Sequence, residues 1–200
     1  MTHLDDIRSG VLRFRNHVFP QRRALYELLA NHQAPQVLFI GCIDSRVDPA
    51  ELCDADPGDM FVERTPGNIV PSYAETRSGI SASIEYAVTA LGVTDIIVCG
   101  HSDCGALKAV LHPEKLAALP AVERWLHYTD AAAEAAARIG GEDSLRSLCE
   151  QNVLAQMRHL RTHPCVAARP GIRIHGWVYQ IHTGEVFAAD EASGTFALWP

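Results

Sequence analysis

The stretch Val37-Leu38-Phe39-Ile40-Gly41-Cys42 is the clearest structural signal in the sequence. Four consecutive apolar residues closed by a glycine are typical of a strand that is buried on both faces, as strands are in a parallel sheet. Further along, Ile96-Ile97-Val98-Cys99-Gly100-His101 repeats the same layout. Both stretches therefore predict buried strands, and in each one a glycine and then a possible metal ligand follow the apolar run.

Helical patterns alternate with the predicted strands. A short strand is expected at residues 60–62, and residues 81–91 then place apolar side chains at helical spacing up to Gly92, a typical helix C-cap. Residues 104–160 are helical in composition, with an interruption at Gly140-Gly141. Strands that alternate with helices predict one α/β domain over residues 1–200, with a central, mostly parallel β-sheet flanked by helices.

The two ends of the chain depart from this alternation. Residues 1–32 carry spaced apolar residues on both sides of Pro20, which predicts two amphipathic helices that form an N-terminal helical arm. Because the sheet begins only after this arm, we expect the arm to pack on a second copy of the chain. Near the other end, residues 172–189 predict a late β-hairpin around His182-Thr183-Gly184.

The composition argues against several classes of protein. Of the 200 residues, 48% are hydrophobic, and 24 acidic against 17 basic side chains give a net charge of −7. Scattered basic residues on an acidic chain disfavour nucleic acid as a partner. The apolar runs fall far short of the roughly 20 residues that a membrane-spanning helix needs. The start of the sequence lacks the apolar region of a secretory signal, so we expect a cytoplasmic location without membrane association.

The six cysteines are interpreted for a reducing compartment, where cysteines are more often metal ligands, catalytic groups or core residues than disulfides. Cys42 and His101 follow strands whose carboxyl ends should share one edge of the sheet, and Cys104 comes shortly after His101. Two thiolates and one imidazole suit Zn²⁺, and three protein ligands leave one position open, as in catalytic zinc sites. We therefore expect one zinc ion per chain.

Asp44 and Arg46 lie close to Cys42 in the sequence, and they decide whether this zinc site is open or closed. The carboxylate of Asp44 could be a conditional fourth zinc ligand. Held away from the metal, it could instead accept a hydrogen bond from a zinc-bound water. Arg46 is the natural cation to hold it, because a guanidinium can grip a carboxylate with two parallel hydrogen bonds.

The two half-motifs Cys42-Ile43-Asp44-Ser45-Arg46 and His101-Ser102-Asp103-Cys104-Gly105 together resemble the β-class carbonic anhydrases. Segments similar to that family extend over about residues 25–180. They are Arg64-x-x-Gly67-Asn68, Ser83-Ile84-Glu85-Tyr86-Ala87, Glu150-x-Asn152-Val153 and His175-Gly176-Trp177-x-Tyr179.

The resemblance implies reversible hydration of carbon dioxide to bicarbonate and a proton by a zinc-bound hydroxide. It implies zinc on Cys42, His101 and Cys104, with the Asp44–Arg46 pair orienting the nucleophile. It also implies a substrate pocket that one subunit shares with its neighbour, in a dimer or a dimer of dimers. The residues implied to line this carbon dioxide pocket are Gln33, Phe61 and Tyr86.

The sequence departs from the family pattern in three places, one of which is Ala106, where many members have glycine. Thr65-Pro66 stands where the family usually has an asparagine and a small aliphatic residue, and proline lacks an N–H and fixes φ. Members that bind bicarbonate at an allosteric site hold it with a tryptophan, an arginine and a tyrosine. The matching residues here are Phe39, Arg64 and Tyr179, so the tryptophan is missing.

Other functions remain open from the sequence. The same scaffold could hydrolyse a sulfur analogue such as carbonyl sulfide or carbon disulfide, because that reaction needs the same nucleophile in a differently shaped pocket. A non-catalytic, zinc-stabilised scaffold subunit is a second alternative, and the Asp44–Arg46 pair argues against it. A cysteine hydrolase built on Cys104 and His101 lacks a recognisable orienting partner.

The remaining cysteines and most of the remaining histidines are expected to have no role in catalysis. Cys99 is expected to pack in the core, and Cys53, Cys149 and Cys165 to be inert thiols. His175 and His182 flank the predicted hairpin, where they could form a second metal site or a proton relay. The histidines expected to be solvated are His3, His17, His32, His112, His127, His159 and His163.

A zinc centre with two thiolates should also be a weaker Lewis acid than one with three neutral histidines, because the thiolates cancel the metal's formal charge. The nucleophile then forms at higher pH. The expected result is hydration activity that rises from about pH 7 to about pH 9.

Overall fold

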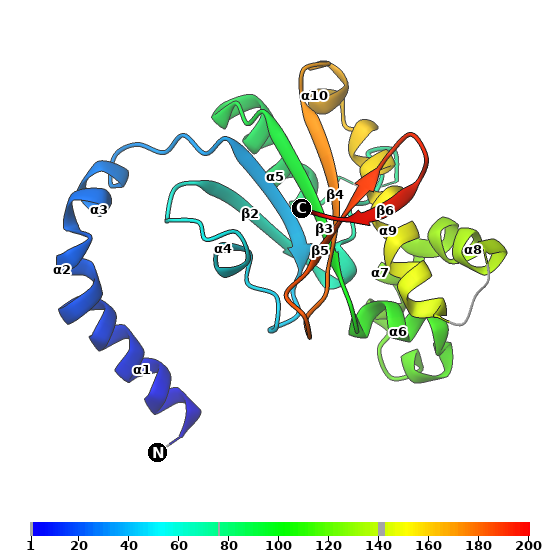
Figure 1. Ribbon diagram of the computed structural model, residues 1–200, viewed down its shortest axis with the longest axis horizontal. Helices are drawn as coiled ribbons and strands as arrows, with labels where there is room; N and C mark the ends of the chain where they lie inside the picture. Colours follow the sequence, from blue (N-terminus) through cyan, green and yellow to red (C-terminus); the bar gives the residue numbers. More distant parts are fainter. Residues whose placement is uncertain (1, 76, 140–142) are drawn as a thin grey trace. The chain divides into compact units, whose positions relative to one another are not determined.

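The computed structural model describes residues 2–75, 77–139 and 143–200, which fall into two units, Met1–Ala34 and Pro35–Pro200 (Figure 1). The predicted interruption at Gly140-Gly141 lies outside the described residues. No helix in the described part of the chain is long and apolar enough to cross a membrane.

The N-terminal unit is helical, as expected, but Pro20 does not break it. Helix α1 (His3–Arg13) begins with a capping box between Thr2 and Asp5, and a π-helical segment (Phe14–Val18) leads directly into α2 (Phe19–Gln21). The wider π turn accommodates the proline ring, which would clash with the preceding turn of a regular α-helix. The interruption comes at Arg22, with φ −112° and ψ 17°, before α3 (Arg23–Leu29).

Three aromatic rings hold this unit together. Phe19 stacks on Tyr26 with ring centroids 5.3 Å apart, and Phe14 meets Tyr26 edge to face at 5.7 Å. None of residues 2–34 is buried, and apolar side chains are exposed along the helices. They include Leu4, Ile7, Val11, Leu12, Val18 and Leu28. The unit therefore has an apolar surface without a core of its own.

The second unit is built on a six-stranded sheet in the order β2-β1-β3-β4-β5-β6. Strands β2, β1, β3 and β4 are parallel, and β5 and β6 are antiparallel additions at one edge. The strands are β1 (Val37–Cys42), β2 (Met60–Thr65), β3 (Asp95–His101), β4 (Arg173–Tyr179), β5 (Val186–Asp190) and β6 (Thr195–Leu198). The predicted α/β class, mostly parallel sheet and late hairpin β4–β5 are confirmed, while β2 is longer than expected and β6 was not anticipated.

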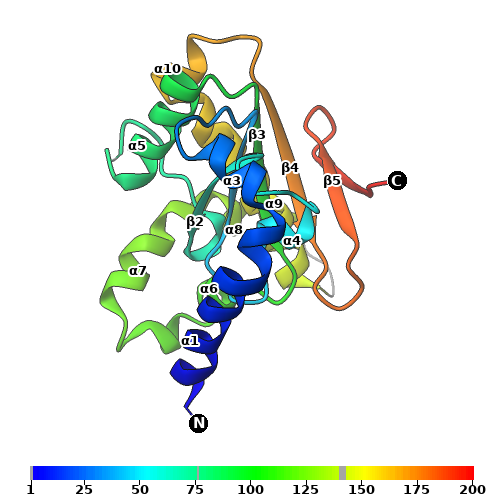
Figure 2. The same cartoon turned by 90° about the vertical axis from the view of Figure 1, so that its left-hand side faces the viewer.

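The helices of this unit lie mainly on one face of the sheet and beyond its carboxyl edge, and α10 lies beside α5 in both views (Figures 1 and 2). The α-helices are α4 (Pro49–Leu52), α5 (Gly79–Glu85), α6 (Gly105–Leu111), α7 (Pro120–Leu126), α8 (Asp130–Ile139), α9 (Ser144–Arg161) and α10 (Pro164–Ala167). The other helical segments are η2 (Pro66–Asn68), η3 (Tyr86–Leu91), η4 (Pro113–Leu116) and η5 (His127–Thr129). The segment α5–η3 ends at Gly92 in the left-handed conformation (φ 74°), as the predicted C-cap requires.

Alternating side chains of each strand enter different cores, as strand geometry dictates. Leu38 and Ile40 join the main core, which α5 and α9 cover, whereas Phe39 faces a smaller cluster with Trp177 on the other side of the sheet. Helix α9 approaches the sheet very closely, because a Cβ on Gly176 would lie only 2.6 Å from the sulfur of Met157. Glycine in β4 therefore sets the distance between α9 and the sheet.

Candidate active site

Cys42, His101 and Cys104 converge at the carboxyl edge of the sheet. Cys42 ends β1, His101 ends β3, and Cys104 is the residue that precedes α6. All three are buried, and their possible ligand atoms lie within 4.8 Å of one another. The carboxyl ends of β1 and β3 thus bring together, at one edge of the sheet, three groups that could hold a metal ion.

The imidazole of His101 is oriented for a ligand at Nε2. Its Nδ1 lies 2.8 Å from the carbonyl oxygen of Ser102, to which a proton on Nδ1 is donated. This tautomer leaves the lone pair on Nε2, a buried atom with no hydrogen-bond partner in the described part of the chain. Buried polar atoms are rarely left unpaired in native proteins. A metal ion held between this nitrogen and two sulfurs would satisfy it, and the donor set fits zinc.

The two cysteines interact directly. The hydrogen bond from the thiol of Cys104 is the largest influence on Cys42 and lowers its pKa, against the opposing effect of burial. Backbone N–H groups of Asp44 and Gly67 also lower it. The same bond to Cys42, together with burial, raises the pKa of Cys104. Without a cation the pair retains one proton, so a metal ion is what would make both sulfurs thiolates.

Arg46 holds the carboxylate of Asp44 with the two-pronged grip that its chemistry suggested. The Nε and Nη2 groups of Arg46 donate to Oδ1 and Oδ2 of Asp44 at 2.9 and 2.8 Å, and the backbone N–H of Arg46 donates to Oδ1 at 3.0 Å. These hydrogen bonds hold the pKa of Asp44 well below its usual range. Oδ2 of Asp44 lies 3.9 Å from Nε2 of His101, which puts an ionised carboxylate beside the possible metal position.

Sequence reasoning gave no role to Asp103, although it lies within the second half-motif. Nη1 of Arg46 donates to Oδ2 of Asp103 at 2.8 Å, and Nη2 donates to the backbone carbonyl of Asp103 at 3.1 Å. The other carboxylate oxygen of Asp103 accepts from the ammonium group of Lys108 in α6. Arg46 thus joins the loop after β1 to the loop after β3, an arrangement that no local sequence pattern could reveal.

Arg64 in β2 fixes the backbone on which the first ligand lies. Its Nε donates to the carbonyl oxygen of Cys42 at 2.9 Å, and its Nη2 donates to that of Asp44 at 2.7 Å. Phe39 is fully buried and meets Trp177 edge to face, with ring centroids 6.3 Å apart. At two of the three positions that match the allosteric bicarbonate residues, Arg64 therefore binds backbone carbonyls and Phe39 packs in the core.

Polar residues of α9 anchor the segment that follows β2. Nδ2 of Asn152 donates to the carbonyl of Gly67 at 2.9 Å, and Oε1 of Gln156 accepts from the N–H of Val70 at 2.9 Å. Gln156 also donates to Asn152 at 2.8 Å, and both side chains are fully buried. Because the N–H of Gly67 hydrogen-bonds Cys42, this network supports the ligand loop from behind. Sequence reasoning noted Asn152 only as part of a resemblance and missed Gln156.

The residues expected to line the substrate pocket fall in both units. Phe61 in β2 and Tyr86 at the start of η3 lie together, with ring centroids 5.9 Å apart, and Tyr86 is 48% exposed. Gln33 is exposed and belongs to the N-terminal unit, after α3. Beside the site, the carbonyl of Pro66 accepts a hydrogen bond from the indole of Trp125 at 2.9 Å, which ties this unusual proline to α7.

The other cysteines match their expected roles. Cys99 is fully buried, and burial raises its pKa above the ordinary range of a thiol. Cys149 is also buried, and burial raises its pKa to about 12. The pKa values of Cys53 and Cys165 are raised by burial as well. Thiols with raised pKa values form little thiolate, so these four are poor nucleophiles.

The expectation that His163 is solvated is wrong. Its side chain is buried, Nε2 lies 3.1 Å from the carbonyl oxygen of Pro71, and burial lowers its pKa. His159 is partly buried, with Nδ1 2.8 Å from the carbonyl oxygen of Val70. Both contacts join residues far apart in the sequence. The other histidines expected to be solvated are exposed: His3, His17, His32, His112 and His127.

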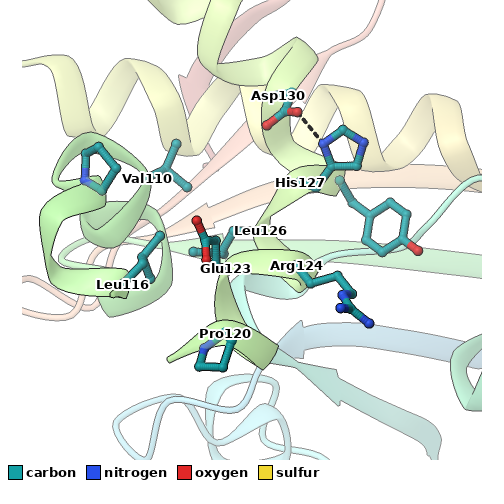
Figure 3. A pocket seen from close by; sticks show the side chains of 10 residues that line it. Val110, Leu116, Pro120, Glu123, Arg124, Leu126, His127 and Asp130 are labelled. Carbon is teal, nitrogen blue, oxygen red and sulfur yellow. Dashed lines mark ion pairs between the residues drawn. The ribbon is translucent and has the colours of Figure 1, made fainter. Parts of the chain in front are cut away.

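A pocket of about 660 Å³ lies away from these groups, among residues from α6 to the start of α8 (Figure 3). Val110 and Leu116 lie on one side of the pocket, and Glu123 and Arg124 of α7 also line it. His127 is paired with Asp130 at its rim. None of the predicted site residues lines this pocket, so it does not belong to the candidate active site.

An open three-ligand donor set at the carboxyl edge of a parallel sheet belongs to the catalytic metalloenzymes of the α/β class, since structural zinc sites are closed by a fourth ligand. The carbonic anhydrase family model matches residues 37–186 of the chain. A carbonic anhydrase from Pseudomonas aeruginosa is 49% identical over 197 residues, which cover 96% of this chain and 90% of that protein.

Solved structures agree with this assignment. The β-carbonic anhydrase CcaA has a TM-score of 0.94 and 39% identity, and the match covers 99% of this chain and 92% of CcaA. One of the tetrameric β-carbonic anhydrases of Sordaria macrospora has a TM-score of 0.83 and 29% identity, with 94% of this chain and 96% of that chain covered. The chain therefore belongs to the β-class carbonic anhydrase family, and it is a zinc enzyme that interconverts carbon dioxide and bicarbonate.

Proposed function

We propose that Cys42, His101 and Cys104 hold one zinc ion per chain and that the reaction takes place at the position they leave open. The observation that carries this proposal is the buried Nε2 of His101, which has no hydrogen-bond partner among the described residues and belongs to a histidine grouped with two cysteines whose ligand atoms lie within 4.8 Å of one another. Zinc, when bound, would lower the pKa of a water molecule, so that the water could attack carbon dioxide as hydroxide. The chain's own part is to supply the donor atoms, fix the tautomer of His101 and stabilise the thiolates.

Asp44 and Arg46 orient the nucleophile. The pKa of Asp44 is well below its usual range because Arg46 donates two side-chain hydrogen bonds to it, so the carboxylate is ionised at neutral pH. An ionised carboxylate accepts a hydrogen bond from an attacking water and fixes the direction of its lone pair. Arg46 keeps Asp44 beside the metal position instead of on it, which leaves that position to water.

The substrate meets an apolar wall. The tilted ring pair of Phe61 and Tyr86 offers a surface with few polar groups, which suits carbon dioxide, and the exposed fraction of Tyr86 leaves room for a contact from a neighbouring subunit. Gln33 donates a hydrogen bond to a substrate oxygen. The last role follows from the family resemblance alone.

Residues 1–200 act as one catalytic domain whose helical arm, residues 1–32, packs on a second copy of the chain. The exposed apolar side chains of α1 and the lack of any buried residue in 2–34 support this arrangement, because such a surface requires a partner to cover it. The S. macrospora relatives are tetrameric, which favours a dimer or a dimer of dimers here. Six free cysteines suit a reducing compartment, so we place the protein in the cytoplasm.

Stopped-flow hydration of carbon dioxide, with metal analysis of the same sample, tests the proposal. We expect about one zinc per chain and activity that rises between about pH 7 and pH 9, because two thiolates weaken the metal as a Lewis acid. Carbonyl sulfide should be turned over far more slowly than carbon dioxide. Stoichiometric zinc without carbon dioxide turnover at either pH would overturn the proposal.

A further inference from the structure

Arg46 is shared between two carboxylates, and only one of them belongs to the pair discussed above. It donates two side-chain bonds to Asp44, and it also donates to the side chain of Asp103 at 2.8 Å and to the backbone carbonyl of Asp103 at 3.1 Å. The contacts to Asp103 span 57 positions in the sequence. Asp103 therefore links the loop that carries Asp44 to the loop that carries the other two donor residues.

Asp103 is itself held firmly. It lies between His101 and Cys104 with φ 61°, a left-handed conformation that few residues other than glycine, asparagine and aspartate adopt readily. Its second carboxylate oxygen accepts from Lys108 in the first turns of α6. The anchor point for Arg46 is thus fixed both by the ligand loop and by the helix that follows it.

The pair formed by Asp44 and Arg46 would be less constrained without this anchor. Arg46 is 43% exposed, and an exposed ion pair by itself restrains its members weakly. Oδ2 of Asp44 lies only 3.9 Å from Nε2 of His101, so a small movement of the pair would bring the carboxylate onto the open metal position. A cation at that position would favour the movement.

We propose that Asp103 is a positioning residue: through Arg46 it holds the carboxylate of Asp44 off the open metal position, so that a water or a small anion can enter. The proposal rests on the proposed zinc site. Lys108 supports it by orienting Asp103. Neither residue touches the substrate.

The test compares Asp103→Asn with the native protein, both loaded with Co²⁺, in a spectral titration with thiocyanate. Asparagine keeps the shape of Asp103 and tolerates the left-handed conformation, so the fold is retained. If Asp44 then occupies the metal position about nine-tenths of the time, the apparent affinity for thiocyanate falls about tenfold. Plain electrostatics predicts the opposite sign, because removing a negative charge near the site should strengthen anion binding.

Glu191→Gln is the matched control, because Glu191 is a similarly exposed carboxylate that also pairs with an arginine, Arg161. Both residues are far in sequence from the proposed metal ligands. It should leave thiocyanate binding within twofold of the native value. Unchanged or tighter binding in Asp103→Asn would overturn the proposal. If Asp103→Asn weakens thiocyanate binding to the cobalt protein while the native zinc protein fails to hydrate carbon dioxide, the proposed function fails and the positioning role stands.

Discussion

Replacing Asp44 with asparagine tests whether the hydration of carbon dioxide requires an ionised carboxylate beside the metal position. The substitution keeps the size of the side chain but removes its charge and one of its two acceptor oxygens. Arg46 then loses at least one of the hydrogen bonds that it makes at 2.9 and 2.8 Å. The amide accepts a hydrogen bond from water less strongly than a carboxylate does, and it no longer fixes the direction of the nucleophile.

The expected loss follows from that geometry. Misplacing a reacting group by about 1 Å can cost about 10²-fold in rate. We therefore expect kcat/KM for carbon dioxide to fall by about 10²-fold, which corresponds to about 2.7 kcal/mol. Zinc content should not change, because the three proposed donor side chains are untouched.

Stopped-flow hydration and metal analysis measure both quantities, with Asp48→Asn as the control. Asp48 lies on the same loop and caps α4 through the N–H groups of Ala50 and Glu51, a role that asparagine fills equally well. The control should keep full activity. An activity of Asp44→Asn within twofold of the native value would refute the role of the carboxylate, and loss of zinc would identify Asp44 as a standing ligand.

Two further predictions concern stability. Gln156→Ala should lower the free energy of unfolding, measured in urea, by roughly 3 kcal/mol, because it leaves the N–H of Val70 and the Oδ1 of Asn152 buried without partners. The control is Gln151→Ala, on the same helix. Because Gln151 is only partly buried, this substitution should lower the free energy of unfolding by less than about 0.5 kcal/mol. Equal losses would contradict the network. Hydrogen bonds from Arg173, and less strongly from His175, lower the pKa of Asp95 in the folded state. The contribution of Asp95 to the free energy of unfolding is therefore complete above the unfolded pKa of about 3.9, and it is lost as the pH falls through the lower pKa of the folded state. Asp95→Asn should therefore lower Tm at pH 6 and have a smaller effect at pH 2, and an equal effect at both values would contradict this account.

The sequence predicted those parts of the fold that local patterns encode. The runs before Gly41 and Gly100 are continuously apolar because β1 and β3 are central strands with both faces covered. The metal ligands could be predicted for the same reason, since the carboxyl ends of adjacent parallel strands must meet. Strand β2 was predicted too short because Glu63 and Arg64 are polar, as an edge strand permits. Strand β6 is four residues long and carries too weak a pattern to be recognised.

The remaining features depend on contacts between distant segments. The grip of Arg46 on Asp44 is local and was predicted, whereas its bond to Asp103 depends on how two loops meet. The local sequence predicts that His163, beside Pro164, is exposed to solvent. It is instead buried against Pro71, whose carbonyl oxygen it contacts and which lies 92 residues away in the sequence. Pro20 breaks helices in general, but a π turn absorbs it here. In each case tertiary structure overrides a sound local rule.

Cys104→Ser tests most directly whether Cys42, His101 and Cys104 bind the zinc ion that the reaction requires. Cys99→Ser is the control. Both cysteines are fully buried near the end of β3, but Cys99 lies outside the ligand group. Zinc per chain and carbon dioxide hydration should be measured on the same samples. We expect Cys104→Ser to lose zinc and activity together, whereas Cys99→Ser keeps both. Full zinc and full activity in Cys104→Ser would contradict the account.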